Sequence, residues 1–430
     1  MKFRSTRGTS AVGLSEAIAA GVATDGGLYV PESLPQFVPQ DFAVDSTLAA
    51  VASRLLAPFF ADDPLASQLD AICAEAFTFP APLRALASAD DFVLELFHGP
   101  TVAFKDFGAR FLAACMQRLP REASRPLTIL VATSGDTGAA VGAAFAGLPG
   151  FRVVILYPDG RVSPRQAHQL GYFGGNVAAL RIAGSFDDCQ RLVKQAFGDA
   201  ELRARVPLSS ASSISLGRLL PQMTYYAHAA LVHWRTQSTH FNFVVPTGNL
   251  GNALACVLAR TCGLPIGRIA LATNANRTLR DFFAGADYAP RESLPTLANA
   301  MDVGAPSNFE RLRWLYPDAD ELRHEFQAFA IDDAAIRETI RNRHARHREV
   351  FCPHTATAIH ALELLRAGGE GGDWCAVATA HPAKFDSIIE PLIGGPIAIP
   401  PALADLLARP AHAESLAADY AALRARLSRD

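Results

Sequence analysis

The sequence lacks the patterns that define metal sites and disulfide frameworks. Its seven cysteines are scattered without a C-x-x-C pair, and its twelve histidines form no spacing such as H-E-x-x-H. The arginine-rich segment around His344 and His347 is typical of a solvated helix face rather than of a metal site. We therefore expect reduced, mostly buried thiols and no metal ion.

Long apolar runs and blocks of like charge are missing as well. No stretch approaches the roughly 20 apolar residues of a membrane helix, and the N-terminal segment has no apolar signal core. A formal net charge of -3 argues against nucleic acid or an anionic membrane as the main partner. We expect a cytoplasmic protein that acts on a small molecule, as a monomer or a homodimer.

Lysine is scarce. Only four of the 39 basic residues are lysines, at positions 2, 105, 194 and 384. Arginine stays protonated, whereas a desolvated lysine loses its proton readily and becomes a nucleophile. Lys105 follows an apolar Val-Ala-Phe approach at the start of an expected helix, and Lys384 follows an expected strand end. We prefer Lys105 as the reactive amine and keep Lys384 as its rival; a snorkelling surface residue is the other possibility.

Apolar strand patterns alternate with helical patterns over most of the chain, which predicts an α/β fold of parallel sheets covered by helices on both faces. Residues 1–85 read as a separate, α-rich N-terminal unit. We expect two further α/β domains, a smaller one over residues 86–235 and a larger one over residues 236–430. In such sheets ligands bind at the carboxyl ends of the strands.

Three expected strand ends carry polar or glycine-rich turns. The turn at 134–138 reads SGDTG and precedes a helix, where free N–H groups can bind an anion, although ordinary capping by Ser134 or Asp136 explains it equally well. The turn at 248–252 reads GNLGN, which suits a small phosphate better than a dinucleotide, or else is a purely structural turn. Thr379 ends a third strand and could offer a hydroxyl to a ring nitrogen, or could be a simple strand residue.

Together, a reactive lysine, a phosphate-sized glycine turn and a strand-end hydroxyl are the parts that pyridoxal 5'-phosphate requires. Two other classes stay open at this point. A cofactor-free Schiff-base aldolase also needs one buried lysine, and a catalytically silent binding protein would use the same turns without chemistry. Bound pyridoxal phosphate would make the protein yellow, whereas an aldolase of that kind would be colourless.

Nine stretches along nearly the whole chain resemble the threonine synthase family, a group of fold type II enzymes that use pyridoxal phosphate. They are "STRG" at 5–8, "DGGLYVPE" at 25–32, "HGPTVAFKDFG" at 98–108, "TSGDTGAAV" at 133–141, "VSPRQ" at 162–166, "VPTGNLGN" at 245–252, "MDVGAPSNFERL" at 301–312, "PHTATA" at 353–358 and "ATAHPAKF" at 378–385. The resemblance implies a phosphate-eliminating lyase that converts O-phospho-L-homoserine and water into L-threonine and phosphate, the last step of threonine biosynthesis.

The resemblance also implies roles for individual residues. Lys105 matches the Schiff-base lysine, and Thr379 matches the partner of the pyridine nitrogen. The cofactor-phosphate loop matches Gly248, Asn249, Leu250, Gly251 and Asn252, and Asp136 falls where related enzymes place a polar group beside the cofactor ring. The candidate substrate contacts are Ser134, Thr137, Ser163, Ser215 and Arg218.

One stretch departs from the family pattern. In "SSISLGRLLPQ" (212–222), Ser212 and Ser215 stand where the family has asparagines, whereas Arg218 is kept. A serine is shorter, so a direct contact made by asparagine would be lost or bridged by water. This departure leaves room for a related lyase that releases 2-oxobutanoate from phosphohomoserine, serine or threonine.

Overall fold

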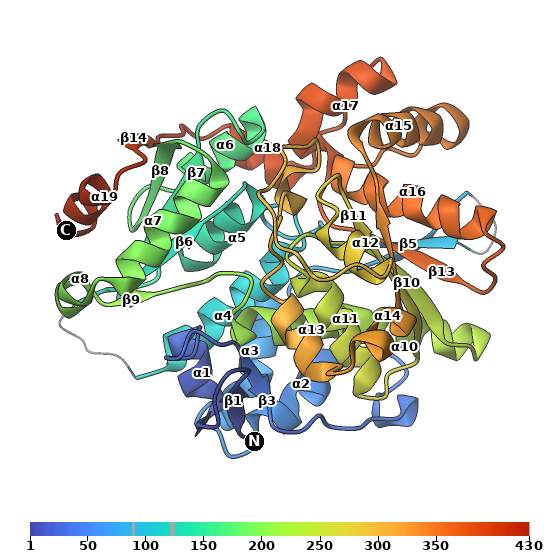
Figure 1. The fold of residues 1–430 in the computed structure, drawn as a ribbon, viewed down its shortest axis with the longest axis horizontal. Helices are drawn as coiled ribbons and strands as arrows, with labels where there is room; N and C mark the ends of the chain where they lie inside the picture. Colours follow the sequence, from blue (N-terminus) through green and yellow to red (C-terminus); the bar gives the residue numbers. More distant parts are fainter. Residues whose placement is uncertain (88–90, 121–124, 430) are drawn as a thin grey trace.

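The computed structural model describes residues 1–87, 91–120 and 125–429, arranged in three sheets with helices around them (Figure 1). The N-terminal unit holds a small antiparallel sheet of order β2-β1-β3. The sequence missed this sheet because its strands have only two or three residues. Its elements are β1 (Phe3–Ser5), β2 (Ala11–Val12), α1 (Leu14–Ala20), β3 (Tyr29–Pro31), α2 (Leu48–Leu56) and α3 (Leu69–Ala76).

The second sheet is parallel and has five strands in the order β14-β8-β7-β6-β9. Its strand β7 alternates between two cores, with Val153 and Ile155 on one face and Val154 and Leu156 on the other. Both faces are therefore buried, as the near-continuous apolar pattern predicts. The strands are β6 (Leu127–Ala132), β7 (Phe151–Pro158), β8 (Val177–Ala183), β9 (Leu208–Ser209) and β14 (Glu414–Ala417), and the intervening helices are α5 (Asp136–Phe145), α6 (Pro164–Gly171), α7 (Phe186–Gly198) and α8 (Ala200–Arg205).

The third sheet has six strands in the order β12-β11-β10-β13-β5-β4. It is parallel except for the edge pair β4–β5, which is antiparallel. Its strands are β4 (Leu83–Ala85), β5 (Asp91–Glu95), β10 (Phe241–Pro246), β11 (Ile266–Thr273), β12 (Phe326–Ala330) and β13 (Trp374–Ala378).

Most remaining helices follow or cover these strands. Residues 185–206 and 217–236 each form more than one helix. The first segment breaks between α7 and α8, where Asp199 caps α8 by accepting from Leu202 N at 2.9 Å, and the second breaks around Pro221. The helices are α4 (Lys105–Arg118), α9 (Leu216–Leu219), α10 (Met223–Gln237), α11 (Gly251–Thr261), α12 (Thr278–Phe283), α13 (Phe309–Leu315), α14 (Ala319–Glu325), α15 (Asp333–His347), α16 (Pro353–Ala367), α17 (Asp386–Ile393), α18 (Pro401–Leu407) and α19 (Tyr420–Leu427). Among the described helices, none has the length and apolar character needed to cross a membrane.

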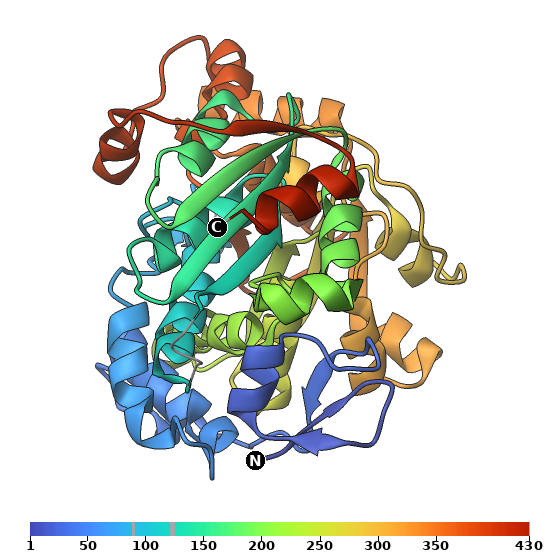
Figure 2. The same ribbon diagram turned by 90° about the vertical axis from the view of Figure 1, so that its left-hand side faces the viewer.

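The fold class predicted from the sequence is confirmed, but sheet membership cuts across the expected domain boundaries. Strand β5, placed in the unit 86–235, pairs with β13 of the six-stranded sheet. Strand β14, placed in the unit 236–430, pairs with β8 of the five-stranded sheet, and α19 lies over that sheet beside α7 (Figure 2). The three units stay a prediction, and the chain crosses between the two large sheets three times, after β5, after β9 and after β13.

The C-terminal helix is held by a small apolar core, which leads to a stability prediction. Leu423 of α19 is fully buried against residues of β7, β8 and α7. Replacing Leu423 with alanine should lower the free energy of unfolding by about 2–5 kcal/mol, because it leaves a cavity. Leu364→Ala, at a side chain that is 43% exposed, serves as the control and should change it by no more than about 0.5 kcal/mol. Equal effects in urea unfolding would contradict this account.

Candidate active site

Lys105 begins α4 directly after a segment that is paired with the end of β13. Phe104 N donates to Thr379 O at 2.8 Å, His381 N donates to Val102 O at 3.0 Å, and Ala103 forms a bridge with Ala380. Val102 has a φ of 49°, which is rare for a β-branched residue and costs on the order of 1–3 kcal/mol. These bonds hold the strained turn and place Lys105 beside the strand end that carries Thr379.

A buried carboxylate shapes the turn before Lys105. Asp106 accepts from Thr101 N at 2.9 Å and from Thr101 Oγ1 at 2.6 Å. A side chain at Gly99 would meet Asp106 Oδ2 at 2.5 Å, so only glycine fits there. The "HGPTVAFKD" pattern is thereby explained as a closed turn that orients the first residue of α4.

The amine of Lys105 is free to react. Among the described residues it has no hydrogen-bond or ion-pair partner, and its Nζ lies 4.6 Å from the ring centre of Phe104. Burial lowers the pKa of Lys105 to about 7, and the charge of Arg218 acts in the same direction, while Asp136 opposes both. A substantial fraction of the amine is therefore unprotonated near neutral pH, as a nucleophile or a base requires.

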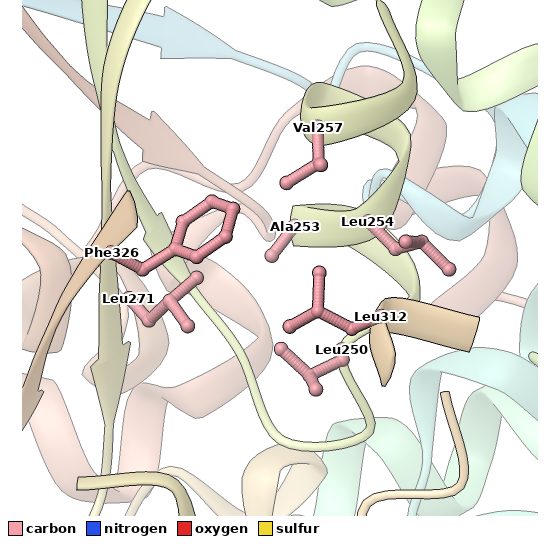
Figure 3. Close-up of a pocket in the computed structure, with 7 residues that line it drawn as sticks. All are labelled: Leu250, Ala253, Leu254, Val257, Leu271, Leu312 and Phe326. Atoms are coloured by element: carbon pink, nitrogen blue, oxygen red, sulfur yellow. The ribbon is translucent and has the colours of Figure 1, made fainter. Parts of the chain in front are cut away.

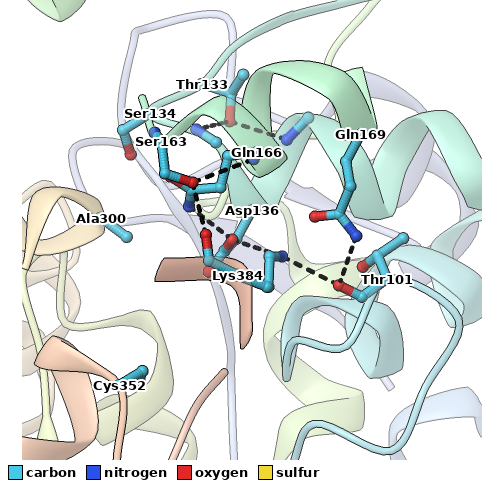
Figure 4. Close-up of polar contacts among 12 residues, drawn as sticks. Thr101, Thr133, Ser134, Asp136, Ser163, Gln166, Gln169, Ala300, Cys352 and Lys384 are labelled. Carbon is cyan, nitrogen blue, oxygen red and sulfur yellow. Dashed lines mark hydrogen bonds and ion pairs between the residues drawn. The ribbon is translucent and has the colours of Figure 1, made fainter. Parts of the chain in front are cut away.

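Lys384, the alternative candidate for the reactive amine, already has partners within the protein. Its Nζ lies 2.7 Å from Asp136 Oδ1 and donates to Thr101 O at 3.0 Å, and the side chain is completely buried (Figure 4). Burial alone would raise the pKa of Asp136, but the charge of Lys384, the nearby His354 ring and hydrogen bonds from Lys384 and Gln166 outweigh it and hold that pKa below its usual value. Lys384 therefore balances a buried carboxylate, which leaves Lys105 as the available amine.

The SGDTG turn is capped by a residue that the sequence analysis did not name. Thr133 Oγ1 accepts from Gly135 N at 3.0 Å and from Gly138 N at 2.9 Å, so neither Ser134 nor Asp136 caps α5. Within the described parts of the chain, the hydroxyls of Ser134 and Thr137 have no protein partner, and both residues keep partial exposure. The turn thus offers two hydroxyls to a ligand, with Asp136 turned inward to Lys384.

The turn at 248–252 has the form of an anion-binding cradle. Leu250 adopts a left-handed conformation with φ 62°, and a side chain at Gly248 would meet Met301 Cα at 2.7 Å. No N–H group of residues 248–250 donates to any acceptor in the described chain. Successive free N–H groups at a helix start are what a phosphate group binds.

Apolar packing beneath the turn fixes its position. Leu250 is buried in a pocket of exclusively apolar side chains, shown in Figure 3, together with Ala253, Leu254, Val257, Leu271, Leu312 and Phe326. Asn252, next along, accepts from the Tyr225 and Tyr226 hydroxyls, while its buried Nδ2 finds no partner. A buried donor without an acceptor next to free N–H groups is consistent with a phosphate at this place.

These features fit pyridoxal phosphate, the cofactor that the sequence suggested. The loop supplies donors for a phosphate, Lys105 supplies an amine for an aldehyde, and Thr379 supplies a buried hydroxyl for which the described chain holds no partner. The short helix η5 (Asn299–Met301) lies between the two turns: Asn299 Nδ2 donates to Ser134 O at 3.3 Å, and Met301 packs on Gly248. The SGDTG turn and the phosphate loop therefore belong to one site.

The candidate substrate residues divide into engaged and free side chains. Ser163 Oγ donates to Lys384 O at 2.6 Å and caps α6 by accepting from Gln166 N, so it acts as a structural cap and not as a free ligand group. Ser215 Oγ and Arg218 Nε are buried without partners, while Arg218 Nη1 donates to Ala211 O. The free groups are therefore Ser134, Thr137, Ser215 and Arg218.

Several residues of the site carried no signal that the sequence analysis used. Gln166 Nε2 donates to Asp136 Oδ1 at 2.9 Å, and His354 Nε2 accepts from Ala300 N at 3.0 Å. Burial lowers the pKa of His354 to about 4, so this ring is neutral. Both lie in stretches quoted for the resemblance, "VSPRQ" and "PHTATA", but nothing in their spacing revealed their partners. Across the described residues, no cluster of three His, Cys, Asp or Glu side chains could hold a metal ion.

Comparisons with known proteins point to the same chemistry. Residues 80–380 match the family described as pyridoxal-phosphate dependent enzyme, residues 2–77 match the threonine synthase N terminus, and residues 355–426 match the threonine synthase C-terminal family. The chain is 40% identical over 420 residues to threonine synthase of Escherichia coli K12, covering 96% of each protein.

Solved structures agree with the sequence comparison. The crystal structure of threonine synthase from Escherichia coli has a TM-score of 0.91 at 38% identity and covers 99% of both chains. That of pyridoxal-phosphate-bound threonine synthase from Brucella melitensis has a TM-score of 0.90 at 35% identity and covers each chain completely.

The depressed pKa of Lys105 gives a test by chemical modification. We expect the initial rate of reductive methylation of Lys105 in the apoprotein, followed by peptide mass spectrometry, to rise with pH through a midpoint of about 7, because the unprotonated amine reacts. A lysine in an unstructured model peptide, with a midpoint of about 10.4, is the reference. A midpoint for Lys105 near that of the peptide would show that burial and Arg218 do not act as described.

The buried pair Lys384–Asp136 gives a test by double substitution. Lys384→Met should lower the free energy of unfolding by about 3–5 kcal/mol, because it leaves a buried carboxylate without its counter-charge. The double variant Lys384→Met/Asp136→Asn should recover part of that loss in denaturant unfolding. Arg191→Met, which removes an exposed pair with Asp188, is the matched control at about 0–1 kcal/mol. Strictly additive losses for Lys384 and Asp136 would contradict the pairing.

Proposed function

Because the chain belongs to the threonine synthase family, whose members use pyridoxal phosphate to convert O-phospho-L-homoserine and water into L-threonine and phosphate, we propose that Lys105 carries the cofactor in this reaction. The observation that supports this assignment most strongly is the contrast between two lysines. Lys105 is unpaired with a pKa of about 7, whereas Lys384 is locked to Asp136. Of these two amines, only Lys105 is available for covalent attachment.

We assign the remaining cofactor contacts to groups that the protein itself leaves free. The N–H groups of Gly248, Asn249, Leu250 and Gly251 and the Nδ2 of Asn252 would hold the phosphate, and the neutral Thr379 hydroxyl would meet the pyridine nitrogen. Asp136 contributes through its charge, and its Oδ1 is occupied by Lys384 and Gln166. Bound pyridoxal phosphate supplies an electron sink that makes protons on the neighbouring carbon atoms removable.

Lys105 can move protons in both directions. Its neutral Nζ can accept the proton from the substrate α-carbon, and the nearby Asp136 carboxylate favours the resulting ammonium form. Arg218 disfavours that form, so Lys105 can release the proton again later in the cycle. In the overall reaction the bond between the γ-carbon and the phosphate oxygen breaks, and the water oxygen bonds to the β-carbon.

The substrate side is assigned to the unpaired polar groups around the same site. Ser134 and Thr137 present hydroxyls at the start of α5, and Ser215 Oγ and Arg218 Nε are buried without partners. A substrate carboxylate and phosphate would supply the acceptors that these donors lack, since buried polar groups are otherwise paired. We further propose a cytoplasmic enzyme, as a monomer or a homodimer without a nucleic-acid partner, in keeping with its seven buried, free cysteines.

Covalent trapping and product analysis test this assignment. Borohydride reduction of the protein loaded with pyridoxal phosphate, followed by peptide mapping, should place the modification on Lys105 and not on Lys384. Lys105→Ala should abolish turnover and Lys105→Arg should not restore it, because arginine keeps its proton. Lys194→Ala, at an exposed lysine of α7, is the control and should keep full activity.

The products separate the two reactions that the sequence left open. Phosphate and L-threonine should be released in equal amounts, measured by a phosphate assay and amino-acid chromatography. Accumulation of 2-oxobutanoate in place of threonine would contradict the assignment, and a modified Lys384 would remove Lys105 from its role.

A further inference from the structure

Asn249 of the phosphate loop is held by three residues from two other segments. Its Nδ2 donates to Ser213 Oγ at 2.7 Å, its Oδ1 accepts from Ser307 N, and its carbonyl oxygen accepts from Asn308 Nδ2 at 2.9 Å. The side chain of Asn249 is therefore consumed by protein contacts. It anchors the loop, while the N–H groups beside it stay free for a ligand.

The orientation of Asn308 is set by a buried arginine. Asn308 is completely buried, and its Oδ1 accepts from Arg311 Nη1 at 2.8 Å. Because arginine has only donors, this contact fixes which end of the Asn308 amide is oxygen and turns its Nδ2 toward Asn249. Arg311 thus ensures that Asn308 presents its Nδ2 as the hydrogen-bond donor to the loop.

Arg311 is in turn held by the N-terminal unit. Its Nε donates to Tyr29 O of β3 at 3.0 Å, and the side chain is only 2% exposed. Within the described chain no carboxylate lies within ion-pair distance of Arg311, and its Nη2 is buried without an acceptor. Burying a guanidinium group without a counter-charge is costly, so its presence calls for a role other than stability.

The residue before Arg311 is bound by the same N-terminal unit. Glu310 accepts from Thr6 Oγ1 and forms a two-pronged contact with Arg7, at 2.9 Å from Nε and 2.7 Å from Nη2. Two consecutive residues of α13 therefore form hydrogen bonds with the first 29 residues of the chain. Glu310 provides the outer, partly exposed contact, and only Arg311 continues inward to the loop.

We propose that Arg311 and Asn308 are positioning residues that transmit the packing of the N-terminal unit to the cofactor-phosphate loop. Tyr29 O, Arg311, Asn308 and Asn249 form one continuous chain of hydrogen bonds between the two regions. The N-terminal unit then has a function in cofactor binding, although none of its residues is assigned to the reaction. This proposal rests on the proposed function of residues 248–252 as the phosphate site.

The preference for pyridoxal phosphate over pyridoxal isolates this effect. Both compounds carry the aldehyde, but only the first carries the phosphate that the loop would bind. Dissociation constants for both are measured by visible absorbance with full-length apoprotein, for wild type, Arg311→Met, Arg311→Lys and Asn308→Ala. Glu310→Gln is the matched control, because it lies on the same helix and removes the charge that pairs with Arg7 while leaving the inward chain intact.

We expect the preference for pyridoxal phosphate to fall on the order of tenfold in Arg311→Met and Asn308→Ala, and pyridoxal affinity to stay constant. Arg311→Lys keeps the charge but cannot reach both acceptors with a fork, so it should lose most of the preference too. Glu310→Gln should keep it. Thermal unfolding of each apoprotein identifies any variant that fails to fold, and Arg311→Lys then stands in for Arg311→Met.

Three results would overturn the proposal in distinguishable ways. Variants that keep the wild-type preference would show that the hydrogen-bond chain does not position the loop. Parallel losses for both compounds would show a general structural role. If the wild type and a Gly248→Val variant each bind both compounds equally, residues 248–252 do not bind the phosphate. That result would contradict the proposed function of this loop.

Discussion

The ion pair between Lys384 and Asp136 is the interaction on which the site depends. It lies in the interior and joins three segments that are far apart in sequence: the turn before α4 through Thr101 O, the start of α5 through Asp136, and the segment after β13 through Lys384 itself. A buried pair of charges tolerates little displacement, because loss of either partner leaves the other desolvated. The relative positions of Lys105 and the SGDTG turn are fixed by this constraint.

The same ion pair also explains why Lys105 and Lys384 differ in availability, although the sequence alone could not distinguish them. Both follow apolar segments near a strand end, and both are buried or nearly so. What distinguishes them is the partner: Lys384 Nζ forms an ion pair with Asp136, whereas Lys105 has no ion-pair partner in the described chain, and burial and Arg218 lower its pKa. Residues separated by more than a hundred positions create this difference, so no local pattern carries it.

The sequence was sufficient for features that repeat along the chain. Continuous apolar strands such as Phe241–Pro246 predicted parallel sheets, and the family resemblance named candidate site residues, which stay predictions. It failed where elements are short or where tertiary partners decide. Strands β9 and β14 have too few residues for a pattern, and the capping role of Thr133 instead of Ser134 depends on a loop geometry that Gly135, with φ 131°, makes possible.

Pairing within the protein gives a criterion for reading the rest of the site. Side chains whose polar atoms are all engaged, such as Ser163 and Asn249, shape the site even when a motif suggests direct contact with a ligand. Side chains beside the two turns that are buried with unpaired atoms, such as Asn252 and Arg218, carry an energetic cost that a ligand or water can offset. By this criterion the side chain of Asn249 belongs to the frame and the side chain of Asn252 to the binding surface, although both lie in the same five-residue turn.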